Sequence, residues 1–419
     1  MRRAALVGVW VVLAAAAASF AAEAKLQDGD FVAVIGDSIT EQRQYSVFIE
    51  DYLLACQPAA KLRVMQFGWG GETAGGFRGR MANDCLPFKP TVATTCYGMN
   101  DGGYRPFDES AQGNAYRAAQ TAIVQEFKKA GLRLIIVGSP GVVDADTFRR
   151  DPAAAKMYNE TLSRLRDIAR EVAEKQGVAF ANVFDPMMDA MTKAKAKYGK
   201  DYHVAGADGV HPAPNGQLVM AYAFLKAMGC DGNIGTITVD LAAGKAEATD
   251  GHRVLSCKDG VVEIESARYP FCFFGDPKDP NATSGIIEFV PFNEDLNRLT
   301  LVVKGAKGDK ARVTWGNATK DLPAADLPKG VNLAALFLDN PFCDAFRKLD
   351  QAVRLQQNFE TPMIKDIINK FPTLQRLVPE EAEACDRIRA ALARKDKALF
   401  DAAAAAVVPV KHTVRIETQ

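Results

Sequence analysis

The segment that decides the fold is Phe31-Val-Ala-Val-Ile-Gly-Asp-Ser-Ile-Thr40. Its first five residues form a continuous apolar run that ends at Gly36, which is typical of a strand buried on both faces of a parallel sheet. Ser38 follows on a tight turn, at the end of a strand where open α/β sheets place their ligands. Taken alone, Ser38 is better explained as the N-cap of the next helix. Its interpretation therefore depends on the rest of the chain.

Apolar runs of the same kind alternate with segments of helical periodicity through the first half of the chain. The strand-like runs lie at 62–67, 91–97, 132–137 and 178–184, and the helical segments at 45–54, 112–130 and 153–176. Parallel neighbours need crossover connections, so strands separated by helices predict a three-layer α/β domain. We place this domain at residues 25–230.

The pattern changes after Gly229. Short β-type runs are expected at 234–239, 252–255, 261–265, 285–289, 299–303 and 311–315, and the turns between them predict a compact antiparallel unit at 231–325. From 326 to 419 the pattern is helical and ends in a strand near 409–417. This last segment is either a separate extension or part of the same domain as 231–325.

Three further segments carry residues suited to catalysis. In Asp208-Gly-Val-His211-Pro, the carboxylate can accept a hydrogen bond from Nδ1 of His211 and leave Nε2 to take a proton from a serine hydroxyl. Gly68-Trp-Gly-Gly71-Glu-Thr follows the second strand, and Gly98-Met-Asn100-Asp101 follows the third. Backbone N–H groups and an Asn side chain converging near Ser38 would form an oxyanion hole.

These four blocks, GDSIT, WGGET, GMND and DGVHP, resemble in order those of the SGNH, or GDSL-type, hydrolase family. The resemblance covers about half the chain and implies a flavodoxin-like sheet of order 2-1-3-4-5. It implies that Ser38 is the nucleophile, with His211 as the base and Asp208 as its orienting acid. It also implies oxyanion donors at the N–H of Ser38, the N–H of Gly71 and the side chain of Asn100, with Gly70 as the alternative to Gly71.

The predicted function is a serine esterase that forms an acyl-enzyme and needs neither a metal nor an organic cofactor. The resemblance favours short acetyl esters, above all O-acetyl groups of carbohydrates. A lipase or small-ester acylhydrolase and an O-acetyltransferase remain alternatives. A glycan-binding scaffold with a vestigial esterase domain is an alternative of another class, which the intact set of Ser38, Asn100, Asp208 and His211 disfavours.

Composition and the N-terminus limit the partners. The chain has 51 basic and 51 acidic residues, which gives no basic face for nucleic acid. Arg2 and Arg3 precede an uncharged run from Ala4 to Ala18, which predicts a signal peptide at 1–24 and export to the periplasm or beyond, without stable membrane insertion. The eight cysteines then lie where disulfides can form, although their pairing and the oligomeric state are not predicted.

Overall fold

The computed structural model describes residues 25–418, so the predicted signal peptide lies outside the described residues. A five-stranded parallel sheet forms the first domain, with strand order β2-β1-β3-β4-β5, which confirms the predicted order. Its strands are β1 (Phe31–Gly36), β2 (Arg63–Gln66), β3 (Val92–Cys96), β4 (Leu134–Gly138) and β5 (Ala179–Ala181).

Helices cover both faces of this sheet. Alternate residues of a strand point to opposite faces, and in β1 both sets are apolar and must be buried. Val32 and Val34 of β1 face α2 (Tyr45–Ala55), α6 (Phe184–Tyr198) and α7 (Pro214–Ala227). Ala33 and Ile35 face α3 (Ala74–Asp84), α4 (Asn114–Lys129) and α5 (Pro152–Gln176). Helix α3 was not among the predicted elements.

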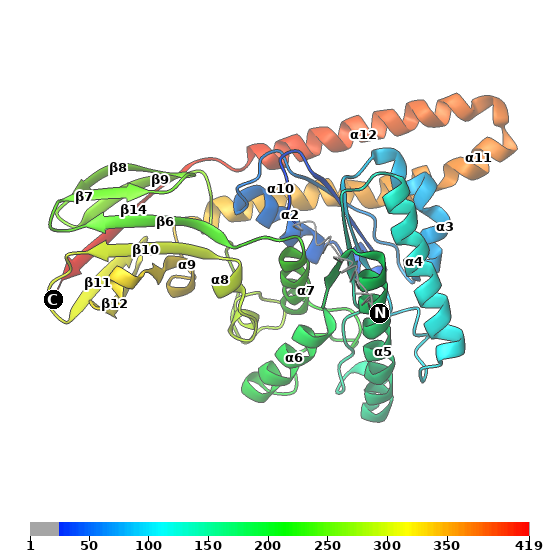
Figure 1. Ribbon diagram of the computed structural model, residues 1–419, viewed down its shortest axis with the longest axis horizontal. Coiled ribbons are helices and arrows are strands. Elements are labelled where there is room, and N and C mark those ends of the chain that lie inside the picture. Colours follow the sequence, from blue (N-terminus) through cyan, green and yellow to red (C-terminus); the bar gives the residue numbers. More distant parts are fainter. Residues whose placement is uncertain (1–24, 419) are drawn as a thin grey trace, which may run out of the picture.

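The second part is a sandwich of two sheets, seen beside the first domain in Figure 1. One sheet has the order β13-β10-β6-β7, and the other has the order β12-β11-β14-β9-β8. Their strands are β6 (Asn233–Asp240), β7 (Lys245–Ala248), β8 (His252–Lys258), β9 (Val261–Ser266), β10 (Arg298–Lys304), β11 (Lys310–Trp315), β12 (Ala318–Pro323), β13 (Val331–Asn332) and β14 (Val410–Thr418).

Two expectations for this part were wrong. The strands β6 and β10 pair in parallel, so the unit is not purely antiparallel. The segment expected as a strand at 285–289 contains the 3-10 turn Ile286–Glu288. A short apolar run does not by itself distinguish a strand from a buried turn, since both bury the same side chains.

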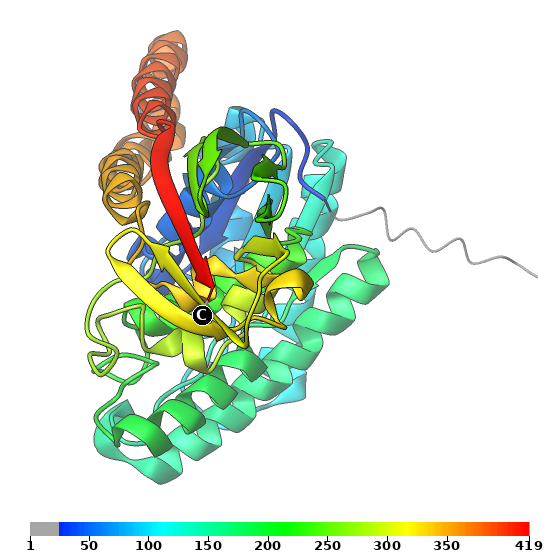
Figure 2. The ribbon, with the colours of Figure 1, turned by 90° about the vertical axis from the view of Figure 1, so that its left-hand side faces the viewer.

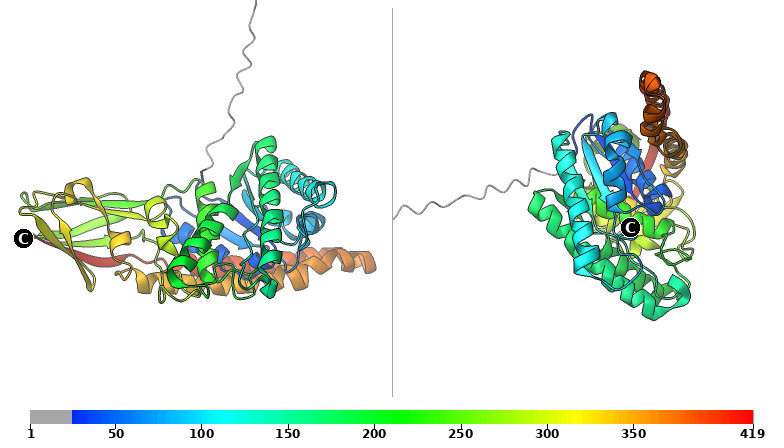
Figure 3. Two further views of the ribbon diagram at one scale, coloured as in Figure 1. Left: turned by 90° about the horizontal axis from the view of Figure 1, so that it is seen from below. Right: turned by 90° about the vertical axis from the view of Figure 1, so that its right-hand side faces the viewer.

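The C-terminal helices lie along the first domain. Helix α10 (Cys343–Pro362) contacts both α2 and α12 (Ala382–Ala405), and α11 (Phe371–Leu377) connects the two long helices (Figure 1). The chain then returns to the sandwich, where β14 pairs with β9 and β11 and crosses the view in Figure 2 as a red strand. Figure 3 shows the sandwich and the first domain side by side, with the C-terminal helices, coloured orange, running along the edge of the first domain.

Candidate active site

Ser38 begins the short helix α1 (Ser38–Glu41) directly after β1. The turn needs Gly36, because a Cβ atom there would lie 2.1 Å from Thr40 Oγ1 and 2.8 Å from the carbonyl oxygen of Cys96. Asp37 caps the helix by accepting a hydrogen bond from the N–H of Ile39 at 3.0 Å. The serine hydroxyl is therefore held at the carboxyl edge of the sheet.

The structure brings Ser38, His211 and Asp208 together. Ser38 Oγ lies 2.8 Å from His211 Nε2, and His211 Nδ1 lies 2.6 Å from Asp208 Oδ2. The other carboxylate oxygen of Asp208 accepts hydrogen bonds from the N–H groups of Val210 and His211, both at 2.9 Å. Since Nδ1–H donates to the carboxylate, Nε2 is left as the acceptor for the serine proton.

The loop geometry also keeps Asp208 ionised. Burial raises the pKa of its carboxyl, but the hydrogen bonds from the backbone and ring of His211 and from the N–H of Val210 outweigh this effect. The pKa of Asp208 consequently lies below its usual value. An ionised Asp208 can stabilise the imidazolium that forms when His211 accepts a proton.

Asn100 is oriented on both sides of its amide. Its Nδ2 donates to the carbonyl oxygen of Glu72 at 3.0 Å, and its Oδ1 accepts a hydrogen bond from Tyr104 OH at 3.2 Å. The first bond uses one of the two amide hydrogens, which leaves the second for a ligand. Tyr104 was not predicted as a site residue, although it lies only four residues after Asn100.

The glycine segment forms a turn from Trp69 to Glu72, closed by a hydrogen bond from the N–H of Glu72 to the carbonyl oxygen of Trp69 at 3.2 Å. Gly71 has φ +71°, a left-handed conformation that favours glycine. Within residues 25–418, neither the N–H of Gly70 nor that of Gly71 donates a hydrogen bond to another protein group. Both therefore remain candidate oxyanion donors.

A buried ion pair between Arg80 and Glu72 holds this turn in place. Arg80 donates from Nε to Glu72 Oε1 at 2.6 Å and from Nη2 to Glu72 Oε2 at 2.8 Å. Tyr97 OH adds a third bond to Glu72 at 2.6 Å, and Arg80 Nη2 also reaches the carbonyl oxygen of Phe67. Glu72 lies in the WGGET block but was not predicted as a site residue, and neither was Arg80, which follows it by eight residues and lies in no recognised block.

Two more buried carboxyl groups lie near the site. Burial raises the pKa of Asp37 to about 7, against the opposing hydrogen bond from Ile39. Burial likewise raises the pKa of Asp101 to about 6, against hydrogen bonds from the N–H groups of Ala74 and Gly98. Through these two hydrogen bonds, Asp101 connects the GMND segment to the first turn of α3.

Several polar and aromatic side chains outside the site have structural partners or are buried. His203 Nδ1 lies 3.5 Å from the buried Asp144, and Lys193, Lys195 and Lys197 of α6 form ion pairs. His252 and His412 are buried in the sandwich. Tyr269, Phe271 and Phe273 are also buried and belong to the hydrophobic core. All eight cysteines are free thiols.

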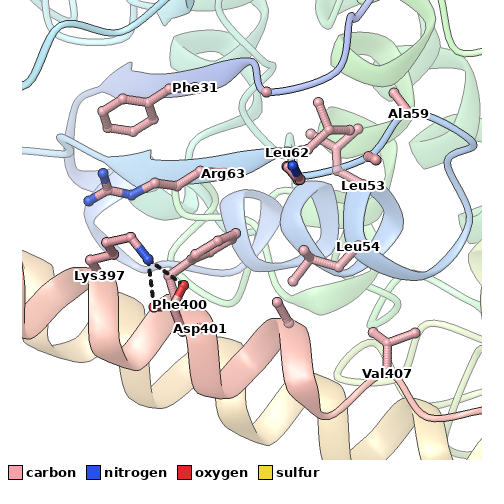
Figure 4. A pocket seen from close by; sticks show the side chains of 14 residues that line it. Phe31, Leu53, Leu54, Ala59, Leu62, Arg63, Lys397, Phe400, Asp401 and Val407 are labelled. Carbon is pink, nitrogen blue, oxygen red and sulfur yellow. Dashed lines mark hydrogen bonds and ion pairs between the residues drawn. The ribbon is translucent and has the colours of Figure 1, made fainter.

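A cavity of about 790 Å³ lies at the opposite end of the sheet from Ser38 (Figure 4). Phe31 and Arg63 come from the starts of β1 and β2, and Lys397 and Asp401 of α12 pair with each other at 2.6 Å. No predicted site residue lines this cavity. Its lining residues do not contribute to the site around Ser38.

Residues 25–418 contain no group of three or more His, Cys, Asp or Glu side chains arranged to hold a metal ion. Over the same residues, none of the helices has both the length and the apolar character that a membrane span requires.

The fold and the site define an ester hydrolase of the three-layer α/β class. Residues 34–219 match the GDSL-like lipase/acylhydrolase family, so the chain contains a domain of this family, followed by further C-terminal sequence. A curated relative, an acetylxylan esterase from Geobacillus stearothermophilus, is 23% identical over 229 residues, which are 49% of this chain and 96% of that protein.

Solved structures extend the comparison. A gut microbial diltiazem-metabolizing enzyme has a TM-score of 0.72 at 22% identity and covers 94% of this chain and 100% of its own. The parallel-sheet domain, the sandwich and the C-terminal helices thus occur together in another protein. The Geobacillus stearothermophilus acetylxylan esterase structure has a TM-score of 0.40 at 22% identity, covering 49% of this chain and 96% of its own.

Proposed function

We propose that this esterase acts through an acyl-enzyme formed on Ser38. The observation that carries the proposal is the continuous hydrogen-bonded chain from Asp208 through His211 to Ser38, with distances of 2.6 and 2.8 Å. His211 takes the hydroxyl proton as Ser38 Oγ attacks the ester carbonyl, and then donates it to the leaving alcohol. Water, deprotonated by His211, attacks the acyl-enzyme and releases the carboxylic acid.

The oxyanion donors complete the proposed mechanism. The free amide hydrogen of Asn100 and the N–H groups of Ser38 and of Gly71 or Gly70 would stabilise the negative charge on the carbonyl oxygen. The donors come from the ends of three neighbouring strands. Parallel strands bring these ends to one edge of the sheet, so the donors are arranged before substrate binds.

For the substrate, we propose acetyl esters of carbohydrates. The support is the curated acetylxylan esterase, which aligns with nearly its whole length to the parallel-sheet domain of this chain. Sequence similarity of this extent supports the reaction type more strongly than the sugar.

The reaction is tested with p-nitrophenyl esters. Ser38→Ala should lower kcat by a factor on the order of 10⁶, because it removes the nucleophile. The matched control is Ser256→Ala, which changes an exposed serine of the sandwich and should keep wild-type activity. A Ser38→Ala enzyme with wild-type turnover would contradict the mechanism.

The substrate proposal is tested separately. kcat/KM should fall steeply from the acetyl to the octanoyl ester, and acetate should be released from acetylated xylan or another acetylated glycan. Faster turnover of the octanoyl ester would favour a lipid or long-chain substrate instead. A Ser38→Ala sample serves as the blank for acetate release.

We also propose export, which rests on the residues before position 25. Expression of the full chain in a Gram-negative host, followed by cell fractionation and N-terminal sequencing, tests it. The expected product is a periplasmic protein that begins near residues 23–25. A cytoplasmic product that retains Met1 would contradict the proposal.

A further inference from the structure

The C-terminal helical segment supplies a cation to the immediate surroundings of the candidate site. Lys365 Nζ lies 2.6 Å from Oε1 of Glu41, the last residue of the helix that begins with Ser38. Lys365 belongs to the turn Met363–Ile367, which follows α10. Both side chains are partly buried. A residue 327 positions after the serine, counted from Ser38 to Lys365, thus contacts the serine's own helix.

The same ion pair packs on the glycine turn. A Cβ atom on Gly70 would lie 2.7 Å from Glu41 Oε2 and 3.9 Å from Lys365 Nζ. Lys365 Nζ also lies 5.1 Å from the centre of the Trp69 ring, within the range of a cation–π interaction. The pair therefore contacts both segments that supply the proposed backbone oxyanion donors.

The charges of Glu41 and Lys365 affect the stability of the negatively charged transition state. A carboxylate beside the glycine turn opposes negative charge on the substrate's carbonyl oxygen, unless a cation compensates it. Within residues 25–418, Lys365 is the basic residue that forms an ion pair with Glu41. Removing the Lys365 charge would leave Glu41 uncompensated next to Gly70.

We propose that Lys365 is a positioning residue for ester hydrolysis, which neutralises Glu41 and holds it against the glycine turn. The proposal rests on the proposed function of Ser38 and the oxyanion donors. It gives the C-terminal segment a role in the reaction, although the segment lies outside the family domain at 34–219.

Contacts other than those of the Lys365 ammonium group hold the C-terminal segment against the first domain. Thr361 Oγ1 accepts hydrogen bonds from Arg43 Nη1 at 2.9 Å and from Gln66 Nε2 at 2.7 Å. Met363 and Ile364 are buried in the core of the first domain. These contacts keep the segment in place without the ammonium group, so a variant lacking only that group should still fold.

The test compares kcat, KM and thermal unfolding of full-length variants on p-nitrophenyl acetate. Lys365→Met keeps the apolar stem but removes the charge, and should lower kcat about tenfold with KM changed by less than about twofold. Lys365→Arg should retain most of the activity, because it restores a cation. Lys370→Met is the matched control, since Lys370 is exposed and close in sequence, and it should match the wild type.

A second variant tests the electrostatic cause. In the double variant Glu41→Gln with Lys365→Met, the opposing carboxylate is gone, so most of the lost kcat should return. A double variant no faster than Lys365→Met, or Lys365→Met with wild-type kcat, overturns the proposal. Ser38→Ala is measured in the same assay: if it stays active, the proposed function fails, and if it is inactive, the result bears on Lys365 alone.

Discussion

The carboxyl group of Glu360 accepts a hydrogen bond from the backbone N–H of Gln66 at 2.8 Å. Gln66 ends β2, the edge strand of the parallel sheet, and Glu360 belongs to α10. Gln356 Nε2 of the same helix donates to the carbonyl oxygen of Val64 at 3.0 Å. Side chains of α10 thus satisfy the backbone groups that an edge strand leaves unpaired.

This contact predicts a loss of stability in Glu360→Ala. The substitution leaves the buried N–H of Gln66 without a partner and should lower the free energy of unfolding by about 1–3 kcal/mol. Urea denaturation followed by circular dichroism measures it. Glu383→Ala, on the exposed first turn of α12, is the control. Equal stability of the two variants would contradict the role assigned to Glu360.

Glu50 makes stability depend on pH. It is buried in α2, and burial raises the pKa of its carboxyl to about 8, against a hydrogen bond from Gln357 Nε2 at 2.7 Å. The folded state holds this proton and the unfolded state loses it near pH 4.5, so the contribution to stability is present below pH 4.5 and is lost as pH rises through 8.

Glu50→Gln should therefore raise the Tm at pH 8.5 and change it little at pH 4.5. The glutamine can still accept the bond from Gln357 through its amide oxygen, and it has no proton to lose. Differential scanning calorimetry of both proteins across this range checks the prediction. A Tm difference that does not grow with pH would show that Glu50 does not titrate as expected.

His412, in the sandwich, makes stability depend on pH in the opposite direction. Trp315 Nε1 can only donate, so the 3.1 Å bond makes His412 Nδ1 an acceptor, and His412 Nε2–H then donates to Ser266 Oγ at 2.8 Å. The Ser266 hydroxyl donates in turn to His252 Nδ1 at 2.7 Å. Burial, followed by the nearby His252, lowers the pKa of His412 to about 4.

Because the unfolded histidine gains its proton near pH 6.5 and the folded one near 4, stability should fall as pH drops through this range, by on the order of 3 kcal/mol. His412→Phe should be less stable than the wild type at pH 7, since Trp315 loses its acceptor. Its stability should depend less on pH between 6.5 and 4. Denaturation curves at several pH values test this, and an unchanged pH dependence would contradict it.

The hydrogen bonds of Asn100 predict a larger loss of kcat in Asn100→Ala than in Tyr104→Phe. Asn100→Ala removes one proposed oxyanion donor and should lower kcat roughly 10²-fold to 10³-fold. Tyr104→Phe removes only the bond that orients Asn100 Oδ1 and should have a smaller effect, about tenfold or less. Steady-state kinetics on p-nitrophenyl acetate measure both. A larger loss in Tyr104→Phe than in Asn100→Ala would contradict this order of roles.

The sequence by itself indicated a parallel sheet, because continuous apolar runs alternating with helical segments are typical of strands buried on both faces. The strand order 2-1-3-4-5 followed only from the resemblance of the four blocks to the GDSL-type family, and the structure confirms it. It also predicted Ser38, Asp208 and His211 as one site: Ser38 from its place at the carboxyl end of a strand, and Asp208 with His211 from their three-residue spacing and the resemblance to the family. The structure brings these three within hydrogen-bonding distance, and their roles in catalysis remain predictions.

The surface that the C-terminal helices cover became known only from the folded structure. The spacing of apolar residues in α10 shows that one face is buried, but it does not identify the surface that buries it. The contacts of Glu360 with Gln66 and of Lys365 with Glu41 join segments about 300 residues apart. Such contacts depend on how complete elements pack, whereas the hydrogen bond between Asp208 and His211 depends on a local loop.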